Sequence, residues 1–219
     1  MPSPLVSVIT PTWQRPERLV ECLATVKNQT YHNIEHIVVS DGPDSKAEEI
    51  VRQECARRFM AGNLPEVRYA ECGFNTTSLF RDSFAVGPLM VGTLLARGEY
   101  QMWLADDEKL DSRHVEWLLG LIQEKQVDFV YPMVYVWSGQ APEKGGYVIG
   151  CEPPRFGHIT SVLYRRELLD KAMHRFHMPR AHPGEIVPDD WDMISRWLEA
   201  GATHAMLNRV TVSHRADHK

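Results

Sequence analysis

The sequence has few cysteines, and none lies close to another. The four are Cys22, Cys55, Cys72 and Cys151. Because no CxxC pair occurs, the spacing indicates neither a zinc site nor a disulfide framework. Buried free thiols in a reducing compartment are the expected state.

A large excess of positive or negative charge is also absent. The formal net charge is -5, and like charges form no block. A nucleic-acid-binding protein usually carries a basic excess or patch. We therefore expect no nucleic-acid binding.

Long apolar runs are missing as well. No stretch approaches the roughly 20 apolar residues that span a bilayer. The first ten residues, MPSPLVSVIT, lack the basic segment and the long apolar stretch of a signal peptide. We expect a soluble, cytoplasmic protein without a membrane span.

Two familiar phosphate-binding motifs are absent. Neither G-x-G-x-x-G nor G-x-x-x-x-G-K-[ST] occurs, which disfavours a Rossmann dinucleotide site and a P-loop. No internal repeat is present either. The 219 residues are enough for one α/β domain with a sizeable core.

Apolar, β-branched runs alternate with helical spacing through the first half of the chain. The expected strands are residues 5–10, 35–40, 66–70 and 101–105, and the expected helices begin near residues 16, 45, 85 and 111. This alternation predicts a mostly parallel, Rossmann-like central sheet with helices on both faces. Ligands of such sheets bind beyond the carboxyl ends of the strands.

The second half is less regular. We expect strands at 127–136, 159–164 and 203–213, helical segments at 166–174 and 189–200, an irregular segment at 72–82, and a long loop or hairpin excursion at 137–157. Long ordered loops are usually functional. This loop and the polar segment 175–189 are therefore expected to shape a binding site.

An acidic corner follows the fourth strand, where Asp106, Asp107 and Glu108 come together. Burying adjacent carboxylates costs free energy unless positive charge lies opposite. A divalent cation bound to a phosphate-bearing ligand is one solution, because Mg²⁺ and Mn²⁺ prefer hard oxygen ligands. A solvated acidic turn is the other interpretation. Residues 10–13 and 41–42 follow two further strands and are candidates for the same edge.

The order and spacing of these segments resemble the family 2 glycosyltransferases. The motifs are Thr10-Pro11-Thr12-Trp13-Gln14-Arg15-Pro16, Ser40-Asp41-Gly42, Arg97-Gly98-Glu99-Tyr100, Leu104-Ala105-Asp106-Asp107, and Asp189-Asp190-Trp191-Asp192 with Arg196. The resemblance covers nearly the whole chain and implies the GT-A fold. It also implies an inverting hexosyltransferase that uses a nucleoside-diphosphate sugar.

The resemblance implies donor-binding roles at the first strand ends. Trp13 would stack on the nucleotide base, with Pro11 and Thr12 framing it. Asp41 would accept a hydrogen bond from a base N–H, which uracil, thymine and guanine all offer. Asp106 would reach the ribose or a metal-bound water.

Further roles carry over to the metal and to catalysis. Asp107 would bind Mn²⁺ or Mg²⁺, and His214 would supply another metal ligand or a phosphate contact. Asp190 would be the general base that takes the proton of the acceptor hydroxyl. Trp191 would flank the acceptor or donor sugar, and His158 is a further acceptor-binding candidate.

The chain departs from the family pattern in the helix before the acidic corner. Leu89 and Met90 stand where many members have Arg-Asn. The contact usually made there is missing, or it comes from Arg15 or Arg81. Residues 1–219 would form one domain, with a nucleotide-binding half at about 1–110 and an acceptor-binding half at about 111–219.

Plainer interpretations stay open. Trp13 could pack as a loop aromatic, Asp41 could belong to a turn, Asp189 suits a helix cap, and His214 could be structural. A nucleotidyltransferase is disfavoured because the first loop has no glycine. A non-catalytic nucleotide-sugar or glycan-binding protein is the third hypothesis. The expected partners are a UDP-, GDP- or dTDP-sugar and a hydroxyl-bearing acceptor, and a homodimer is left open.

Overall fold

The computed structural model describes residues 3–62, 65–80, 85–138, 145–155, 160–176 and 189–216. The strands are β1 (Val6–Thr12), β2 (Ile34–Ser40), β3 (Glu66–Glu71), β4 (Tyr100–Trp103), β5 (Glu108–Leu110), β6 (Phe129–Trp137), β7 (Gly146–Ile149), β8 (Leu163–Arg165) and β9 (His204–Arg215). The helices are α1 (Pro16–Lys27), α2 (Ser45–Ala61), α3 (Thr76–Leu79), α4 (Val86–Leu95), α5 (His114–Lys125), α6 (Asp189–Glu199) and the 3-10 helix η2 (Arg166–Asp170).

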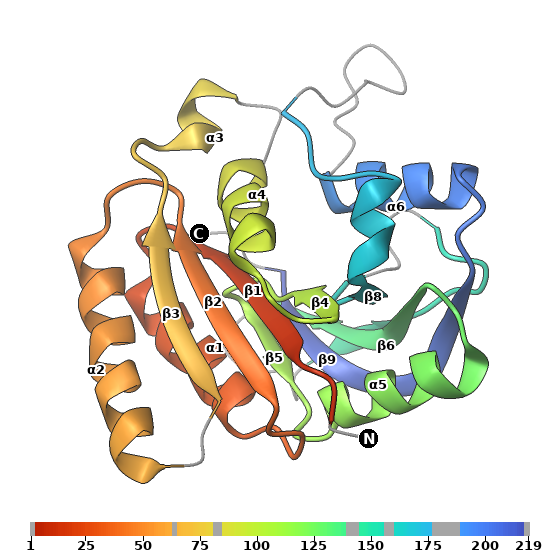
Figure 1. The fold of residues 1–219 in the computed structure, drawn as a ribbon, viewed down its shortest axis with the longest axis horizontal. Helices are drawn as coiled ribbons and strands as arrows, with labels where there is room; N and C mark the ends of the chain where they lie inside the picture. The colour runs from red at the N-terminus through yellow and green to blue at the C-terminus, as the bar shows by residue number, and fades with distance from the viewer. Residues whose placement is uncertain are drawn as a thin grey trace.

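These strands form a curled sheet with helices on both faces (Figure 1). Its order is β3-β2-β1-β4-β8-β6-β9-β5, and β7 pairs with β6. The predicted α/β class is confirmed. No helix in the described part of the chain is both long and apolar enough to cross a membrane.

The first four strands in this order, β3, β2, β1 and β4, pair in parallel. Local signals set the helices between them. Pro16 suits the first turn of α1. Asp44 caps α2 by accepting from the backbone N–H groups of Lys46 and Ala47, and Gly62 ends α2 with φ 82. Parallel pairing brings the carboxyl ends of β1, β2 and β4 to one edge.

The second half completes the sheet with mixed pairing. The strand β8 runs antiparallel between β4 and β6, while β9 is parallel to β6 and antiparallel to β5. In the β5–β9 pair, Glu108 lies opposite His214. This register carries the end of β9 to the acidic corner after β4.

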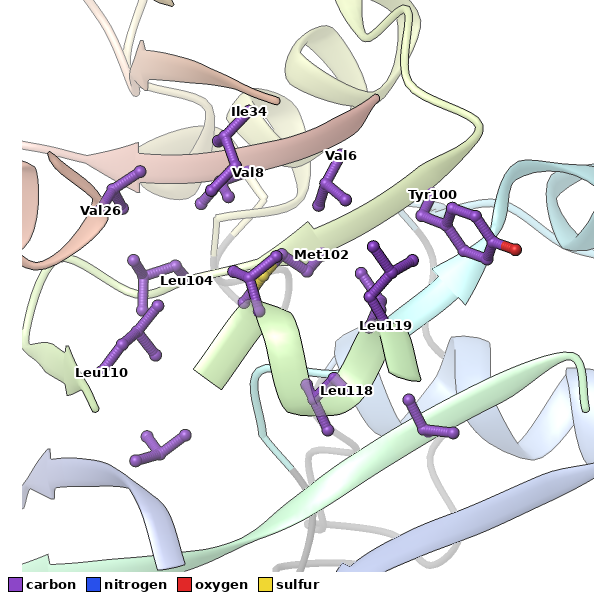
Figure 2. Close-up of a cluster of buried hydrophobic side chains, with 14 of the residues drawn as sticks. Val6, Val8, Val26, Ile34, Tyr100, Met102, Leu104, Leu110, Leu118 and Leu119 are labelled. Carbon is purple, nitrogen blue, oxygen red and sulfur yellow. The ribbon is translucent and has the colours of Figure 1, made fainter. Parts of the chain in front are cut away.

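The described core includes a large cluster on each face of the sheet, and a smaller third cluster lies between α1, α2, β2 and β3. On one face α1 and α5 pack on β1, β4 and β6, and Figure 2 shows Leu118 and Leu119 of α5 in the same cluster as Met102 and Leu104. On the other face α4 and α6 cover a cluster that includes Ile9, Leu89, Trp103, Phe129, Tyr164, Ile194 and Trp197. The helix that carries Asp190 therefore packs on the strand that leads to the acidic corner.

A buried ionic cluster connects β1, β2, β3 and the segment before β4 near the amino-terminal ends of these strands. Glu35 is 1% exposed, and its two oxygens accept from Ser7 Oγ at 2.7 Å, Arg68 Nη2 at 2.7 Å and Arg97 Nε at 2.9 Å. A Cβ at Gly98 would lie 2.6 Å from Ser7 Oγ. The Arg97-Gly98 part of the family motif therefore serves packing.

Several predicted boundaries were wrong. The segment 72–82, expected to be irregular, contains α3, and the three-residue strand β5 was not predicted. The strand expected at 101–105 ends at Trp103, and the strand expected at 159–164 is β8. Both missed elements depend on distant partners, because β5 pairs with β9 and α3 is bound by Asp41. Within the excursion expected at 137–157, the described residues include β7, which pairs antiparallel with β6, and residues 139–144 and 156–157 lie outside the described part.

Candidate active site

A cavity of about 980 Å³ lies at the carboxyl edge of the sheet. Most of the residues predicted to form the site line it, namely Pro11, Thr12, Trp13, Arg15, Asp41, Asp106, Asp107, Asp190 and His214. They come from the ends of β1, β2, β4 and β9 and from the start of α6. The fold thus gathers residues that are far apart in the sequence.

The loop after β1 forms one wall. Gln14 has φ 53, an uncommon value for a residue other than glycine, and its N–H donates to Asp44 Oδ2 at 2.9 Å. Trp13 packs against Gly42, where a Cβ would lie 2.8 Å from Trp13 Cζ3. Gly42 has φ 122, so the turn after β2 needs a residue without a side chain.

Asp41 lies in the cavity wall, but its carboxylate is already bound. Oδ1 accepts from the N–H of Thr76 at 2.8 Å and from its hydroxyl, and Oδ2 accepts from Thr77 N at 3.1 Å and Oγ1 at 2.6 Å. A carboxylate has about four lone-pair sites. Asp41 therefore holds the start of α3, and a base N–H would have to share one of these oxygens.

Asp106 is 5% exposed and binds two residues of the first loop. Its Oδ2 accepts from Thr12 Oγ1 at 2.9 Å, and its Oδ1 lies 3.1 Å from Arg15 Nη1. Burial raises the pKa of Asp106, and the Arg15 charge and the Thr12 hydroxyl oppose that rise. Arg15 therefore brings positive charge to the acidic corner from within the cavity wall.

Asp107 lies between cationic groups. Its Oδ2 is 3.0 Å from Arg18 Nη1 and 3.5 Å from Arg15 Nη1, while its Oδ1 is 3.9 Å from His214 Nδ1. Arg18 had no assigned role in the sequence prediction. Its position in the first turn of α1, beside Arg15, is the signal that could have identified it.

Glu108 completes the acidic corner and was not predicted as a site residue. It is 3% exposed, accepts from Ser161 Oγ at 2.9 Å and from the Thr160 hydroxyl, and lies 3.7 Å from His214 Nδ1. Burial raises the pKa of Glu108. Its adjacency to two aspartates is visible in the sequence, but the contacts with Thr160 and Ser161 require the fold.

The donor set fits a divalent cation that is shared with a ligand. Asp107 offers a carboxylate oxygen and His214 an imidazole nitrogen, both of which Mn²⁺ accepts. The described residues contain no group of three or more His, Cys, Asp or Glu side chains arranged to hold a metal by themselves. Phosphate oxygens commonly supply the remaining ligands of such ions.

The start of α6 forms the opposite wall. Asp189 and Asp190 both line the cavity, and Asp190 Oδ1 accepts from Trp191 N at 2.7 Å. Burial and the neighbouring charge of Asp189 raise the pKa of Asp190 to about 7. A carboxyl group with that pKa can exchange a proton near neutral pH.

Two ion pairs fix this helix start. Asp192 is 4% exposed, and Arg175 binds both of its oxygens, with distances of 3.0 Å and 2.6 Å. Arg196 Nη2 lies 2.8 Å from Asp192 Oδ2 and donates to Met173 O at 2.5 Å. The Asp-x-x-x-Arg part of the motif thus orients the first turn of α6.

Three residues named in the sequence analysis are not placed in the cavity. Trp191 packs against the apolar cluster under α4 and α6 and is not among the lining residues. His158 and Arg81 lie outside the described residues. Leu89 lines the cavity where the family pattern has a polar residue, so that part of the wall is apolar.

The sequence model described as "Glycosyl transferase family 2" matches residues 7–177. The chain belongs to glycosyltransferase family 2. It is 31% identical over 148 residues to glycosyltransferase GlyG of Streptococcus pneumoniae serotype 4, a match that covers 68% of this chain and 45% of GlyG. The chain spans about half the length of the curated relatives it matches, which is 45%, 45% and 50% for three of them.

Solved structures show the same fold at low identity. TarS of S. aureus, residues 1–349 in complex with UDP, gives a TM-score of 0.72 at 16% identity, covering 97% of this chain and 61% of that fragment. The mannosyltransferase PcManGT of Pyrobaculum calidifontis, in complex with GDP-Man and Mn²⁺, gives 0.71 at 16% identity, covering 99% and 58%. The predictions of the family and of the GT-A fold are confirmed.

Proposed function

We propose that this chain transfers a sugar from a nucleoside-diphosphate sugar to an acceptor hydroxyl with inversion. The observation that carries the proposal is that Asp190 and the acidic corner of Asp106 and Asp107 line the same cavity. A base on one wall and a charged site for the leaving group on the other are the two parts of a single displacement.

The donor would lie across the ends of β1 and β2. We assign the base to the wall made by Trp13 and Gly42, because an indole ring suits stacking. Arg15 faces the same cavity and would bind the diphosphate. Asp41 would contribute mainly by holding α3 against this wall. One neighbour binds UDP and the other binds GDP-Man, so both donor classes belong in the test.

The cation would be held by Asp107 and His214. When bound, it supplies Lewis-acid stabilisation of the leaving diphosphate. Asp106 keeps Arg15 at the corner, and Asp190 takes the proton of the acceptor hydroxyl as that oxygen attacks the anomeric carbon. Residues of the 111–219 half, including Trp191 and His158, would form the acceptor side.

The free cysteines of the described chain are in keeping with a reducing compartment. We therefore retain the cytoplasm as the proposed location.

The test is a panel of UDP-, GDP- and dTDP-sugars incubated with the protein and Mn²⁺, in which released nucleoside diphosphate is measured. We expect one base to be preferred and chelation to stop the reaction. Asp190→Asn should lose about 100-fold or more in rate, while the exposed Glu199→Gln on the same helix should not. Full activity of Asp190→Asn would exclude this base, and binding without any turnover would indicate a binding protein.

A further inference from the structure

His174 lies behind the start of α6, outside the cavity. Its side chain is fully buried, and its ring packs edge-on against Trp103 with 5.0 Å between centroids. Its Nδ1 is 3.2 Å from Asp189 Oδ2. In the part of the chain that the structure describes, both ring nitrogens and Asp189 Oδ2 are buried without a hydrogen bond, so the contact is close but not aligned as a hydrogen bond. Asp189 is therefore the polar group that His174 faces.

The two carboxyl groups at the helix start are in different surroundings. Asp189 is 8% exposed, with His174 behind it, whereas Asp190 is more open to the cavity. Adjacent carboxylates compete for one proton, because ionising the second beside the first is unfavourable. Either group could in principle receive the proton of an acceptor. The surroundings of the two carboxyl groups therefore determine which one binds the proton more tightly.

We propose that His174 is a positioning residue that acts through Asp189 and gives Asp190 the greater proton affinity of the two carboxyl groups. The inference rests on the proposed role of Asp190 as the base. A proton on His174 Nδ1 would favour the ionised form of Asp189. The proton shared by the pair then goes to Asp190. During transfer the hydroxyl proton moves to the Asp190 carboxylate as the new C–O bond forms and the bond between the anomeric carbon and the diphosphate oxygen breaks, which releases the nucleoside diphosphate.

Among the residues that the structure describes, no other charged group around the pair replaces this contact. The charges of Arg175 and Arg196 are taken up by Asp192, one turn further along α6. Glu108 lies across the cavity and adds negative charge, which acts on Asp190 in the same direction as Asp189 does. The neighbouring strand β4 faces His174 with Trp103, which carries no charge.

The chain offers matched variants for a test. His174→Phe keeps an aromatic ring beside Trp103 and removes the donor. His174→Asn keeps an N–H donor near the position of Nδ1. Arg175→Gln disturbs the same segment through Asp192 without touching Asp189. Melting curves of all three establish that they fold, and His174→Leu replaces the Phe variant if that one does not.

The first readout is the titration of aspartate side-chain carboxyl groups by ¹³C NMR, with the two signals assigned from Asp189→Asn and Asp190→Asn. In the wild type the step near neutral pH should belong to Asp190. In His174→Phe, Asp189 should take up a proton near neutral pH, and the Asp190 step should move to lower pH because its neighbour's charge is lost. His174→Asn and Arg175→Gln should titrate like the wild type. This readout needs no substrate.

The second readout is hydrolysis of the sugar nucleotide that reacts fastest in the donor panel. The fraction of the pH 8 rate kept at pH 6 should be about threefold larger for His174→Phe than for the wild type. A wild-type titration and pH profile in His174→Phe would overturn the inference, as would a His174→Asn variant that behaves like the Phe variant. If Asp190→Asn hydrolyses the donor at full rate, the proposed function fails, and the NMR titration still decides the role of His174.

Discussion

Arg18 Nη1 lies 3.0 Å from Asp107 Oδ2, so a guanidinium group contacts the proposed metal ligand from the side of α1. Arg15 Nη1 is 3.5 Å from the same oxygen. The arginine side chains therefore compensate the negative charge of Asp107 even without a bound ligand. A divalent cation would have to compete with these contacts or be helped by an anionic ligand that attracts Arg15.

Arg18→Gln should tighten Mn²⁺ binding in the absence of donor, because it leaves the Asp107 charge less compensated. We expect an increase of about fivefold to tenfold in affinity, since the Arg18 side chain is 18% exposed and solvent screens part of its charge. Electron paramagnetic resonance of free Mn²⁺ measures this directly. Arg113→Gln, at the exposed N-cap of α5, is the control, and an unchanged affinity in Arg18→Gln would contradict the prediction.

The rate of donor hydrolysis should fall as pH falls through about 7, because Asp190 must be ionised to accept a proton. With the metal kept saturating, the rate at pH 6 should be about tenfold below that at pH 8. The same raised pKa makes the folded state bind a proton that the unfolded state releases, so it lowers stability as pH rises from about 4 to about 7. Asp190→Asn should therefore melt at a higher temperature than the wild type at pH 8 and lose this advantage near pH 4. A rate independent of pH in this range would count against Asp190 as the base.

Asp41→Asn should weaken donor binding and lower stability together. The amide group can no longer accept both hydrogen bonds from Thr77, so the start of α3 loosens at a cost of about 1–3 kcal/mol. Asp128→Asn is a matched control, because Asp128 Oδ2 accepts from the N–H and hydroxyl of Thr203 at the other end of the sheet. Calorimetry with UDP or GDP should show an affinity loss in the Asp41 variant alone, and equal losses in both would contradict the assignment.

Glu35→Gln should destabilise the protein by about 2 kcal/mol while leaving the donor affinity unchanged. It removes the charge that Arg68 and Arg97 share, and Arg97 is half-exposed, which limits the cost. Burial raises the pKa of Glu35, but hydrogen bonds from Ser7 and Arg97 and the Arg68 charge outweigh it, so the net pKa is lowered. A lowered pKa contributes stability above the unfolded value and loses it as pH falls, so urea unfolding should show a smaller difference at acid pH. A larger effect on donor affinity than on stability would be inconsistent with this role.

Much of the donor side could be predicted from the sequence. The strands 5–10 and 35–40 are short, β-branched and apolar, and the residues that follow them must lie at one edge once the strands are parallel. Trp13, Asp41 and Asp106 could therefore be predicted to lie at this edge, and all three line the cavity. The local signals at Pro16, Asp44 and Gly62 also set helix boundaries well.

What could not be predicted depends on contacts between distant segments. Glu108 needs Thr160 and Ser161, Arg18 needs Asp107, and His174 needs Asp189, and no local pattern records such pairs. The hydrogen bonds of Asp41 were missed for the same reason, since Thr76 and Thr77 lie in a polar segment with weak helical spacing. The roles of Glu108, Arg18 and His174 therefore become visible only in the folded structure.

The ionic cluster around Glu35 bears on how members of this family are recognised. Arg97 and Gly98 lie at the amino-terminal part of the sheet and act in packing, and the family match itself ends at residue 177, before Asp190. A relative that had lost only the proposed base would keep the Arg97-Gly98 signature, which serves packing, and would still match over residues 7–177. We expect catalytically active and inactive members of this family to differ at the helix start, residues 189–192.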